Sequence, residues 1–365
     1  MHRIPARILT SLVLAAAAAL VAAQPIQYGP GSSFATHDIA PGVIAFIPAY
    51  TRGGIVSGNS VAVIGNDSVL VVDTGHFPSQ AQAMIARIRQ ATDKPVRWVV
   101  NTHWHPDHFT GNAAYRDAYP GVTFVASSAT VRRFEDGWKF NDTSAFANVI
   151  ATWQQRLRDG KGADGTALSG PMREFYTSEL PEVENAAREW KDVPHVAPTM
   201  RVDDRMEFDL GGRKVQVMFL GRGNTEGDLV AWVADTRTLV TGDLLVAPLP
   251  YCYGSFISEW AATLRKLDAF DSRAIVPGHG PVYADKRYLR SVIALLDTMQ
   301  AQASAAVAKG VPLEQFQRDA DLSRFEQEMT RGDFFQERIW KDSVVANGLK
   351  RAWREAKEGP LHDED

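Results

Sequence analysis

The sequence predicts a mixed α/β fold with two sheets, and three observations support this prediction. Short apolar runs that are typical of strands occupy residues 43–47, 60–64 and 69–72. Residues 78–91 then repeat apolar side chains at helical spacing and lead into another apolar run at 97–100. A second group of strand-like runs lies in the later half of the chain, so a second sheet and surrounding helices are expected.

The composition is that of a soluble globular protein, and 365 residues suffice for one large domain or two small ones. The 43 acidic residues nearly balance the 39 Lys and Arg residues, which leaves a net charge of −4. The basic residues are scattered, and no basic run is longer than a pair such as Arg132-Arg133. We therefore expect a small-molecule substrate and no nucleic-acid partner. The sequence does not indicate an oligomeric state.

The N-terminus has the pattern of a secretory signal peptide over residues 1–23. Arg3 and Arg7 supply positive charge, an apolar run follows at 8–21, and small residues precede Gln24. The apolar run is shorter than the roughly 20 residues of a membrane span, which disfavours the alternative of a stable membrane anchor. We expect a periplasmic or secreted protein. A lone cysteine, Cys252, excludes an internal disulfide.

The segment before the first strand, residues 24–42, lacks periodicity and is expected to be an extended N-terminal arm. After the strand at 97–100, residues 112–119 have a helical pattern and 121–126 a strand pattern. Residues 127–198 are mostly helix-prone and are expected to form a helical insertion. Four aromatic residues in it form either its core or the wall of an apolar substrate pocket: Phe134, Trp138, Phe140 and Trp153.

The second group of strands is expected to form the second sheet. Its predicted strands are 199–202, 206–210, 214–220, 229–233, 238–240 and 274–276, with a helix at 256–270. Residues 286–365 continue with helical spacing and end in an acidic tail, so we expect a C-terminal helical extension. The predicted main domain is therefore 43–285.

The predicted strand at 97–100 ends in a cluster of potential metal ligands, His103, His105, Asp107 and His108. His103 and His105 are two residues apart, so their rings leave an extended backbone on the same side. Pro106 then ends the strand, and the following turn brings Asp107 and His108 toward the same point. Imidazole and carboxylate groups are preferred ligands of zinc and acceptable ligands of iron or manganese. The alternative is a polar loop with surface histidines.

This H-x-H-x-D-H motif resembles the signature of the metallo-β-lactamase-fold hydrolases, and the resemblance extends over residues 43–283. It implies an αββα four-layer sandwich that holds one or two metal ions at the edge between the sheets. It also implies that Asp243, in Gly242-Asp243, bridges the two ions and that His279, in Pro277-Gly278-His279-Gly280, is a further ligand. Asp73, in an Asp-x-Gly motif, either orients a ligand histidine or caps an ordinary turn.

The chain departs from the family pattern at Asn224, where the family usually has a ligand histidine. By the family's grouping, His103, His105 and Asn224 hold one metal, while Asp107, His108 and His279 hold the other. An amide oxygen is a poorer zinc ligand than imidazole, so we expect the Asn224 site to bind its metal more weakly.

The predicted function is metal-dependent hydrolysis of an ester, lactone, thioester or lactam. A metal with an open position lowers the pKa of bound water to about 7 and so provides hydroxide as the nucleophile. Asp107 or Asp243 takes up or relays the proton. An aspartate at 243 favours esters, lactones and thioesters over lactams in this family, whereas export favours β-lactamase activity. The same residues are also compatible with a mononuclear-iron sulfur dioxygenase or with a non-catalytic binding protein.

Overall fold

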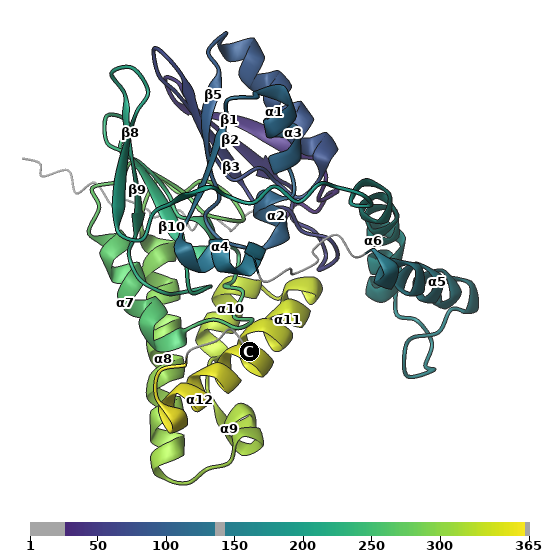
Figure 1. Ribbon diagram of the computed structural model, residues 1–365. Coiled ribbons are helices and arrows are strands. Elements are labelled where there is room, and N and C mark those ends of the chain that lie inside the picture. The colour runs from purple at the N-terminus through teal and green to yellow at the C-terminus, as the bar shows by residue number, and fades with distance from the viewer. Residues whose placement is uncertain (1–25, 136–142, 362–365) are drawn as a thin grey trace, which may run out of the picture.

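The structure, a computed structural model, describes residues 26–135 and 143–361. The predicted signal peptide, 1–23, lies outside the described residues. Two β-sheets lie face to face, and helices cover the outer side of each (Figure 1). The predicted α/β sandwich is therefore confirmed.

The first sheet has seven strands in the order of the chain. They are β1 (Phe34–Ala40), β2 (Val43–Pro48), β3 (Ser60–Ile64), β4 (Val69–Val72), β5 (Val96–Val100), β6 (Thr123–Ala126) and β7 (Met200–Arg201). The pairs from β1 to β4 are antiparallel, and those from β4 to β7 are parallel. Helices α1 (Pro78–Ala91) and α3 (Asn112–Ala118) provide the crossovers that parallel pairing requires.

The second sheet has five strands in the order β12-β11-β10-β9-β8. They are β8 (Arg205–Asp209), β9 (Lys214–Phe219), β10 (Leu229–Val233), β11 (Thr238–Val240) and β12 (Ala274–Val276). β11 and β12 pair in parallel, and helix α7 (Ile257–Asp268) connects them. The polypeptide therefore leaves both strands at the same end of the sheet, which matters for the site described below.

Successive side chains on a strand point to opposite faces of its sheet and therefore belong to different hydrophobic cores. On β2, Val43 and Ala45 belong to the core between the sheets, whereas Ile44 and Phe46 belong to the core beneath α1. On β9, Val217 faces the first sheet and Met218 packs in the core beneath α7. Because adjacent strand residues point to opposite faces, strands buried on both faces are apolar at nearly every position.

Two strand predictions need correction. Residues 24–42 were expected to be an arm, but Phe34–Ala40 forms the edge strand β1 and pairs with β2. Residues 199–202 were expected in the second sheet, but β7 pairs with β6 in the first. Backbone hydrogen bonds from Thr199 N to Phe124 O and from Val202 N to Ala126 O, both 2.9 Å, fix that position. A strand of two residues is too short to show a periodicity that would assign it to a sheet.

The described residues between β6 and β7 include three helices: α4 (Ser128–Glu135), α5 (Ser144–Asp159) and α6 (Gly170–Glu189). The pair α5 and α6 extends away from the sheets, at the right of Figure 1. The Phe134 ring packs 4.4 Å from Phe109, and the Trp153 ring packs 5.1 Å from Phe175. These two aromatic residues are therefore packing residues, whereas Trp138 and Phe140 lie outside the described residues.

The chain ends in helices that cover the second sheet and one end of the sandwich (Figure 1). They are α8 (Arg287–Ala308), α9 (Leu313–Asp319), α10 (Ser323–Thr330), α11 (Phe334–Trp340), the π-helix η2 (Lys341–Gly348) and α12 (Leu349–Glu358). Trp340 and Val344 are fully buried in the same core as Met218 of β9. Among the residues that the structure describes, no helix is both long and apolar enough to cross a membrane.

Candidate metal centre

The histidine motif lies where β5 ends and the short helix α2 (Pro106–Phe109) begins. Nε2 of His103 lies 2.9 Å from Nδ1 of His105, so the two imidazoles face each other. Pro106 occupies the first position of α2, where a missing N–H costs nothing. The helix carries Asp107 and His108 to the same side, and Nε2 of His108 lies 3.4 Å from Oδ2 of Asp107. The motif therefore converges as its spacing predicts.

Two residues from the second sheet reach the same place. Asp243 follows β11 and lies on the short 3-10 helix η1 (Gly242–Leu244), and His279 follows β12. Nε2 of His279 lies 3.0 Å from Oδ2 of Asp107. Because β11 and β12 are parallel neighbours, both strands end at the edge that faces the motif.

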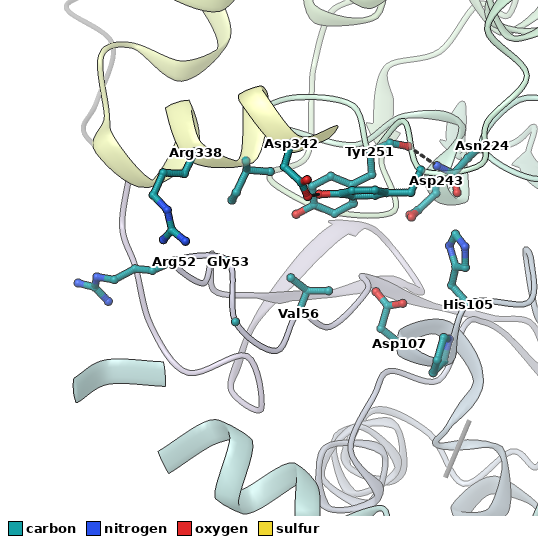
Figure 2. A pocket seen from close by; sticks show the side chains of 14 residues that line it. Arg52, Gly53, Val56, His105, Asp107, Asn224, Asp243, Tyr251, Arg338 and Asp342 are labelled. Carbon is teal, nitrogen blue, oxygen red and sulfur yellow. Dashed lines mark hydrogen bonds between the residues drawn. The ribbon is translucent and has the colours of Figure 1, made fainter. Parts of the chain in front are cut away.

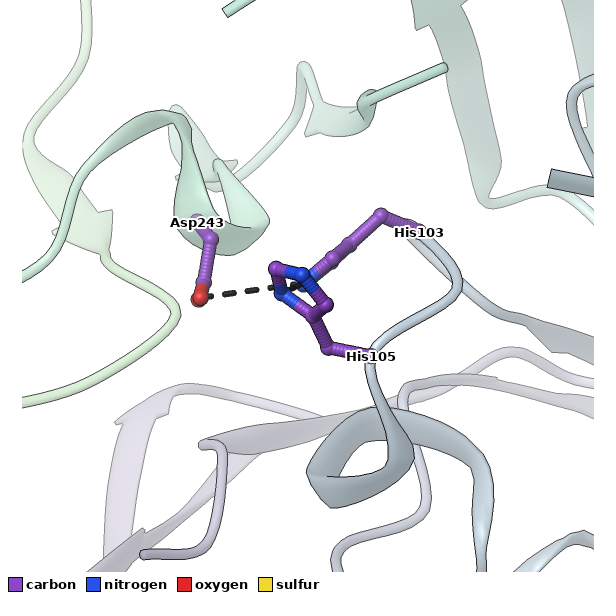
Figure 3. A group of neighbouring side chains, drawn as sticks. All are labelled: His103, His105 and Asp243. Atoms are coloured by element: carbon purple, nitrogen blue, oxygen red, sulfur yellow. Dashed lines mark hydrogen bonds and ion pairs between the residues drawn. The ribbon is translucent and has the colours of Figure 1, made fainter. Parts of the chain in front are cut away.

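These six side chains form two adjoining groups that could each hold a metal ion. His103, His105 and Asp243 make one group, and Asp107, His108 and His279 the other, with donor atoms within 4.8 Å of one another in each. Figure 3 shows the Asp243 carboxylate directed at His103, whose Nε2 is 3.6 Å from Oδ2. The other carboxylate oxygen of Asp243, Oδ1, is 3.2 Å from Nε2 of His108. Asp243 therefore contacts both groups.

Asn224, the departure from the family motif, lies beside these groups. It lines the same pocket as His105, Asp107 and Asp243 (Figure 2). Its Nδ2 donates a 2.7 Å hydrogen bond to the Tyr251 carbonyl. Its Oδ1 is buried and has no hydrogen-bond donor among the described residues. The structure thus brings all seven sequence-predicted residues together, with the amide oxygen of Asn224 free to act as a ligand.

The buried carboxylates and imidazoles shift one another's pKa values. Burial opposes ionisation of Asp107, but the imidazoles of His108 and His279 outweigh it and hold the pKa of that carboxyl well below its usual value. Burial and the same two imidazoles act likewise on Asp243, whose pKa is also held well below its usual value. Both carboxylates are therefore ionised at neutral pH, as metal ligands must be.

The donor set fits a divalent metal. Nε2 of His103 and Nδ1 of His105 are 2.9 Å apart, and Nε2 of His108 and Nε2 of His279 are 3.3 Å apart. Each distance is short enough for both nitrogens of the pair to bind one cation when the imidazoles are neutral. Burial and the charge of His108 hold the pKa of His103 well below its usual value, which favours the neutral form that binds metal.

Asp73 contacts His108 and Thr102 on the side away from the ligand groups. Its Oδ2 lies 2.8 Å from Nδ1 of His108, and its Oδ1 accepts a 2.8 Å hydrogen bond from the Thr102 amide. The Thr102 hydroxyl lies 2.8 Å from Asp73 Oδ2 and 3.0 Å from Nδ1 of His103. The structure therefore favours the orienting interpretation of the Asp-x-Gly motif over the simple turn.

Several residues near the site were missed by the sequence analysis. A Cβ added at Gly58 would overlap the His108 ring, and one added at Gly278 would overlap the Asp243 carboxylate. Asn59 donates from Nδ2 to the carbonyls of Pro277 and Gly280, at 2.8 and 2.9 Å, and so holds the loop that carries His279. These roles depend on contacts between distant segments, which no local pattern reveals.

A further buried histidine, His76, stacks on Trp190 with ring centroids 3.9 Å apart. Its Nδ1 lies 2.5 Å from the Val56 carbonyl, and burial lowers its pKa to about 4. It belongs to neither ligand group. Its place beneath the pocket wall, with 7% of its surface exposed, differs from the pocket rim or surface where a lone histidine is usually found.

The site opens into a cavity of about 640 Å³. His105, Asp107, Asn224 and Asp243 line its inner end, and Tyr251 lies beside them (Figure 2). Its outer wall includes three residues of the C-terminal helices, which are Arg338, Ile339 and Asp342. The sequence analysis had assigned those helices no part in the site.

Comparisons with known proteins agree with this geometry. A linear primary-alkylsulfatase from Pseudomonas sp. (strain ATCC 19151) is 25% identical over 235 residues, which are 62% of this chain. The match spans 42% of that relative, so less than half of its length is represented here.

Solved structures of metallo-beta-lactamases share the fold. DIM-1 metallo-beta-lactamase has a TM-score of 0.50 and 16% identity, and covers 73% of this chain and 98% of its own. The metallo-beta-lactamase from Pontibacter korlensis has a TM-score of 0.50 and 19% identity, and covers 73% and 99%. The family model of the metallo-beta-lactamase superfamily matches residues 53–279, a segment that contains all seven predicted site residues. The chain therefore belongs to the metallo-beta-lactamase superfamily.

Proposed function

We propose that this protein is a metal-dependent hydrolase of small-molecule esters. The observation that carries the proposal is the position of Asp243, whose two carboxylate oxygens face His103 on one side and His108 on the other. One carboxylate between two buried groups of nitrogen and oxygen donors suits a pair of neighbouring metal ions.

We propose zinc as the metal, because imidazole and carboxylate are its preferred ligands apart from thiolate. A bound zinc ion lowers the pKa of water and polarises the scissile bond. The group of Asp107, His108 and His279 also has Asp243 within reach and is expected to fill first. The group of His103 and His105 is completed by Asp243 and the amide of Asn224, so it is expected to bind more weakly.

The residues of the chain supply proton transfer and charge stabilisation. Asp107 lines the cavity and is ionised, so its carboxylate is positioned to accept a proton from the attacking water. Burial raises the pKa of Tyr251, which also lines the cavity, so its hydroxyl keeps its proton. That hydroxyl can donate a hydrogen bond to the negative charge that develops on the substrate oxygen.

The substrate proposal rests on the size of the cavity and on the relatives. A volume of about 640 Å³ suits a small molecule. Similarity to a linear primary-alkylsulfatase adds sulfate esters as a second candidate class. Lactones, thioesters and lactams remain to be compared in the same assay.

The test uses the purified full chain loaded with zinc and chromogenic carboxylate esters, alkyl sulfates, lactones, thioesters and lactams. We expect hydrolysis of at least one ester class, lost on chelation and lost in Asp243→Ala. Asp235→Asn is the control, because Asp235 pairs with Arg213 at a half-exposed position away from the cavity.

Three results would contradict the proposal. Full activity in Asp243→Ala would remove the bridging role. No hydrolysis of any class by the fully zinc-loaded protein would favour a binding protein, and thiol-dependent oxygen uptake by the iron-loaded protein would favour the redox alternative.

We also propose that the chain is exported, which rests on the signal pattern of residues 1–23. N-terminal sequencing of the protein from its native host should find Gln24 as the first residue. An intact N-terminus would contradict export by this route.

A further inference from the structure

The outer end of the cavity contains a cationic group that the hydrolytic chemistry does not use. Arg338, on α11, lines the cavity and is exposed to solvent. Figure 2 shows its guanidinium at one end of the cavity, directed toward the Arg52–Gly53 segment, with His105, Asp107 and Asp243 at the other end. Arg338 lies beyond the segment that matches the superfamily, 53–279.

The guanidinium of Arg338 is held in place without being neutralised. It stacks on the Phe175 ring, 5.0 Å from the ring centroid. Asp342 is four residues further along, but its carboxylate accepts a 2.8 Å hydrogen bond from the Tyr253 hydroxyl. Among residues 26–135 and 143–361, no carboxylate lies within ion-pair distance of Arg338. Its charge is therefore available to a ligand.

The neighbouring arginine of the cavity differs in this respect. The Arg52 guanidinium lies over the Tyr28 and Phe335 rings, 4.8 and 5.4 Å from their centroids. One of its nitrogens is 2.7 Å from the Glu174 carboxylate. In Figure 2 it points away from the inner end of the cavity. Arg52 is thus held at the rim by its own partners. Of the two arginines that line the cavity, Arg338 is the one without a carboxylate partner among the described residues.

We propose that Arg338 binds an anionic group at the end of the substrate remote from the scissile bond. The proposal rests on the proposed function and deepens it by naming a substrate class, which is esters whose acyl chain carries a terminal carboxylate. Val56 lies between the two ends in Figure 2, and Ile339 also lines the cavity, so both suit a short apolar spacer. Guanidinium recognises carboxylate through two parallel hydrogen bonds, which fixes orientation as well as affinity.

The kinetic test compares two substrates of similar length, mono-4-nitrophenyl adipate and 4-nitrophenyl heptanoate. They share the scissile bond, but only the adipate carries a remote carboxylate. We expect the zinc-loaded protein to have a lower KM for the adipate ester than for the heptanoate ester. Arg338→Gln should raise KM for the adipate ester roughly tenfold or more. kcat for adipate and both constants for heptanoate should change little, and Arg338→Lys should restore part of the preference.

Arg324→Gln is the matched control. Arg324 also stacks on a phenylalanine, with its guanidinium 4.3 Å from the Phe325 centroid, but it does not line the cavity. Its replacement should leave the adipate preference intact. Equal KM values for adipate and heptanoate in the unmodified protein, or an unchanged preference in Arg338→Gln, would overturn the inference while leaving the proposed hydrolase standing.

A binding measurement separates failure of the inference from failure of the proposed function. Adipate is titrated into the metal-free protein by calorimetry, which requires no turnover and no metal. We expect binding that Arg338→Gln weakens roughly tenfold or more and Arg324→Gln leaves unchanged. If neither ester is hydrolysed, this titration still decides the inference, and absent or Arg338-independent binding overturns it.

Discussion

The Asp73 carboxylate lies 2.8 Å from Nδ1 of His108, on the side of the ring opposite the ligand group. In the neutral ring that binds metal, the contact selects the tautomer in which Nδ1–H donates to the carboxylate and the lone pair lies on Nε2. It also fixes the ring angle, so that Nε2 points at Asp107, Asp243 and His279. Asp73 therefore positions a ligand without belonging to the ligand set.

Asp73→Asn should weaken zinc binding by roughly 10- to 100-fold, since the amide preserves shape but loses the charge that orients His108. The measurement is competitive titration against a chelator of known zinc affinity, with circular dichroism to verify folding. Asp38→Asn is the control, because Asp38 forms an exposed ion pair with Arg87 on the edge strand β1. An unchanged zinc affinity in Asp73→Asn would show that Asp73 serves only the turn.

Asn224→His should increase metal occupancy. Oδ1 of Asn224 is buried beside the His105 end of the cavity, where the described part of the chain offers it no hydrogen-bond donor, and imidazole is a stronger zinc ligand than an amide. Metal analysis after dialysis against limiting zinc should find more zinc per chain in the variant than in the original protein. Full and equal zinc loading of both proteins would contradict the prediction that the Asn224 group binds zinc more weakly than the group of Asp107, His108 and His279.

His76 should contribute to the pH dependence of stability. Burial lowers its pKa to about 4, below the unfolded value of 6.5, so the unfolded state binds the proton more tightly. The contribution of neutral His76 to the free energy of unfolding is present above pH 6.5 and is lost as the pH falls from 6.5 toward 4. Between pH 7 and pH 5 the loss should be about 2 kcal/mol.

His76→Asn removes this titration while retaining a donor for the Val56 carbonyl. Urea unfolding in the presence of EDTA should show a smaller drop in stability between pH 7 and pH 5 than in the original protein. Because the variant also loses the stacking on Trp190, the comparison concerns the change with pH and not the absolute stability. Parallel pH profiles would contradict the buried, neutral state of His76.

Ser343 links the π-helix η2 to the loop that carries Tyr251. Its hydroxyl donates to the Pro250 carbonyl at 3.0 Å and accepts from the Cys252 amide at 2.7 Å. Ser343→Ala leaves both buried groups unpaired and should lower the free energy of unfolding by about 1–3 kcal/mol. Urea denaturation measures it, and Ser323→Ala, at an exposed position of α10, is the control and should change stability much less.

The parts of this fold and site that could be predicted are those that depend on patterns of residues close together in the sequence. The strands β2 to β5 and the helix α1 follow from periodicity, and the convergence of His103, His105, Asp107 and His108 follows from their spacing after a strand. Asp243 and His279 lie far from that motif along the chain, and only the family resemblance connected them to it.

Other features depend on contacts that sequence patterns do not express. Helical spacing in the C-terminal segment predicted helices there, but Arg338 and Asp342 are exposed polar residues, which look like any solvated surface in the sequence. Asn59 is a single amide in a loop, and its role depends on carbonyls more than 200 positions away in the chain. β7 was misassigned because two residues contain no period.

On the proposed function, α11 and η2 contribute to the choice of substrate, whereas the proposed zinc ligands lie earlier in the chain. Exchange of Arg338, Ile339 or Asp342 should alter which molecules the cavity admits, while every proposed zinc ligand stays unchanged. Variation at these three positions would then offer a route to new substrates that leaves the proposed zinc site intact.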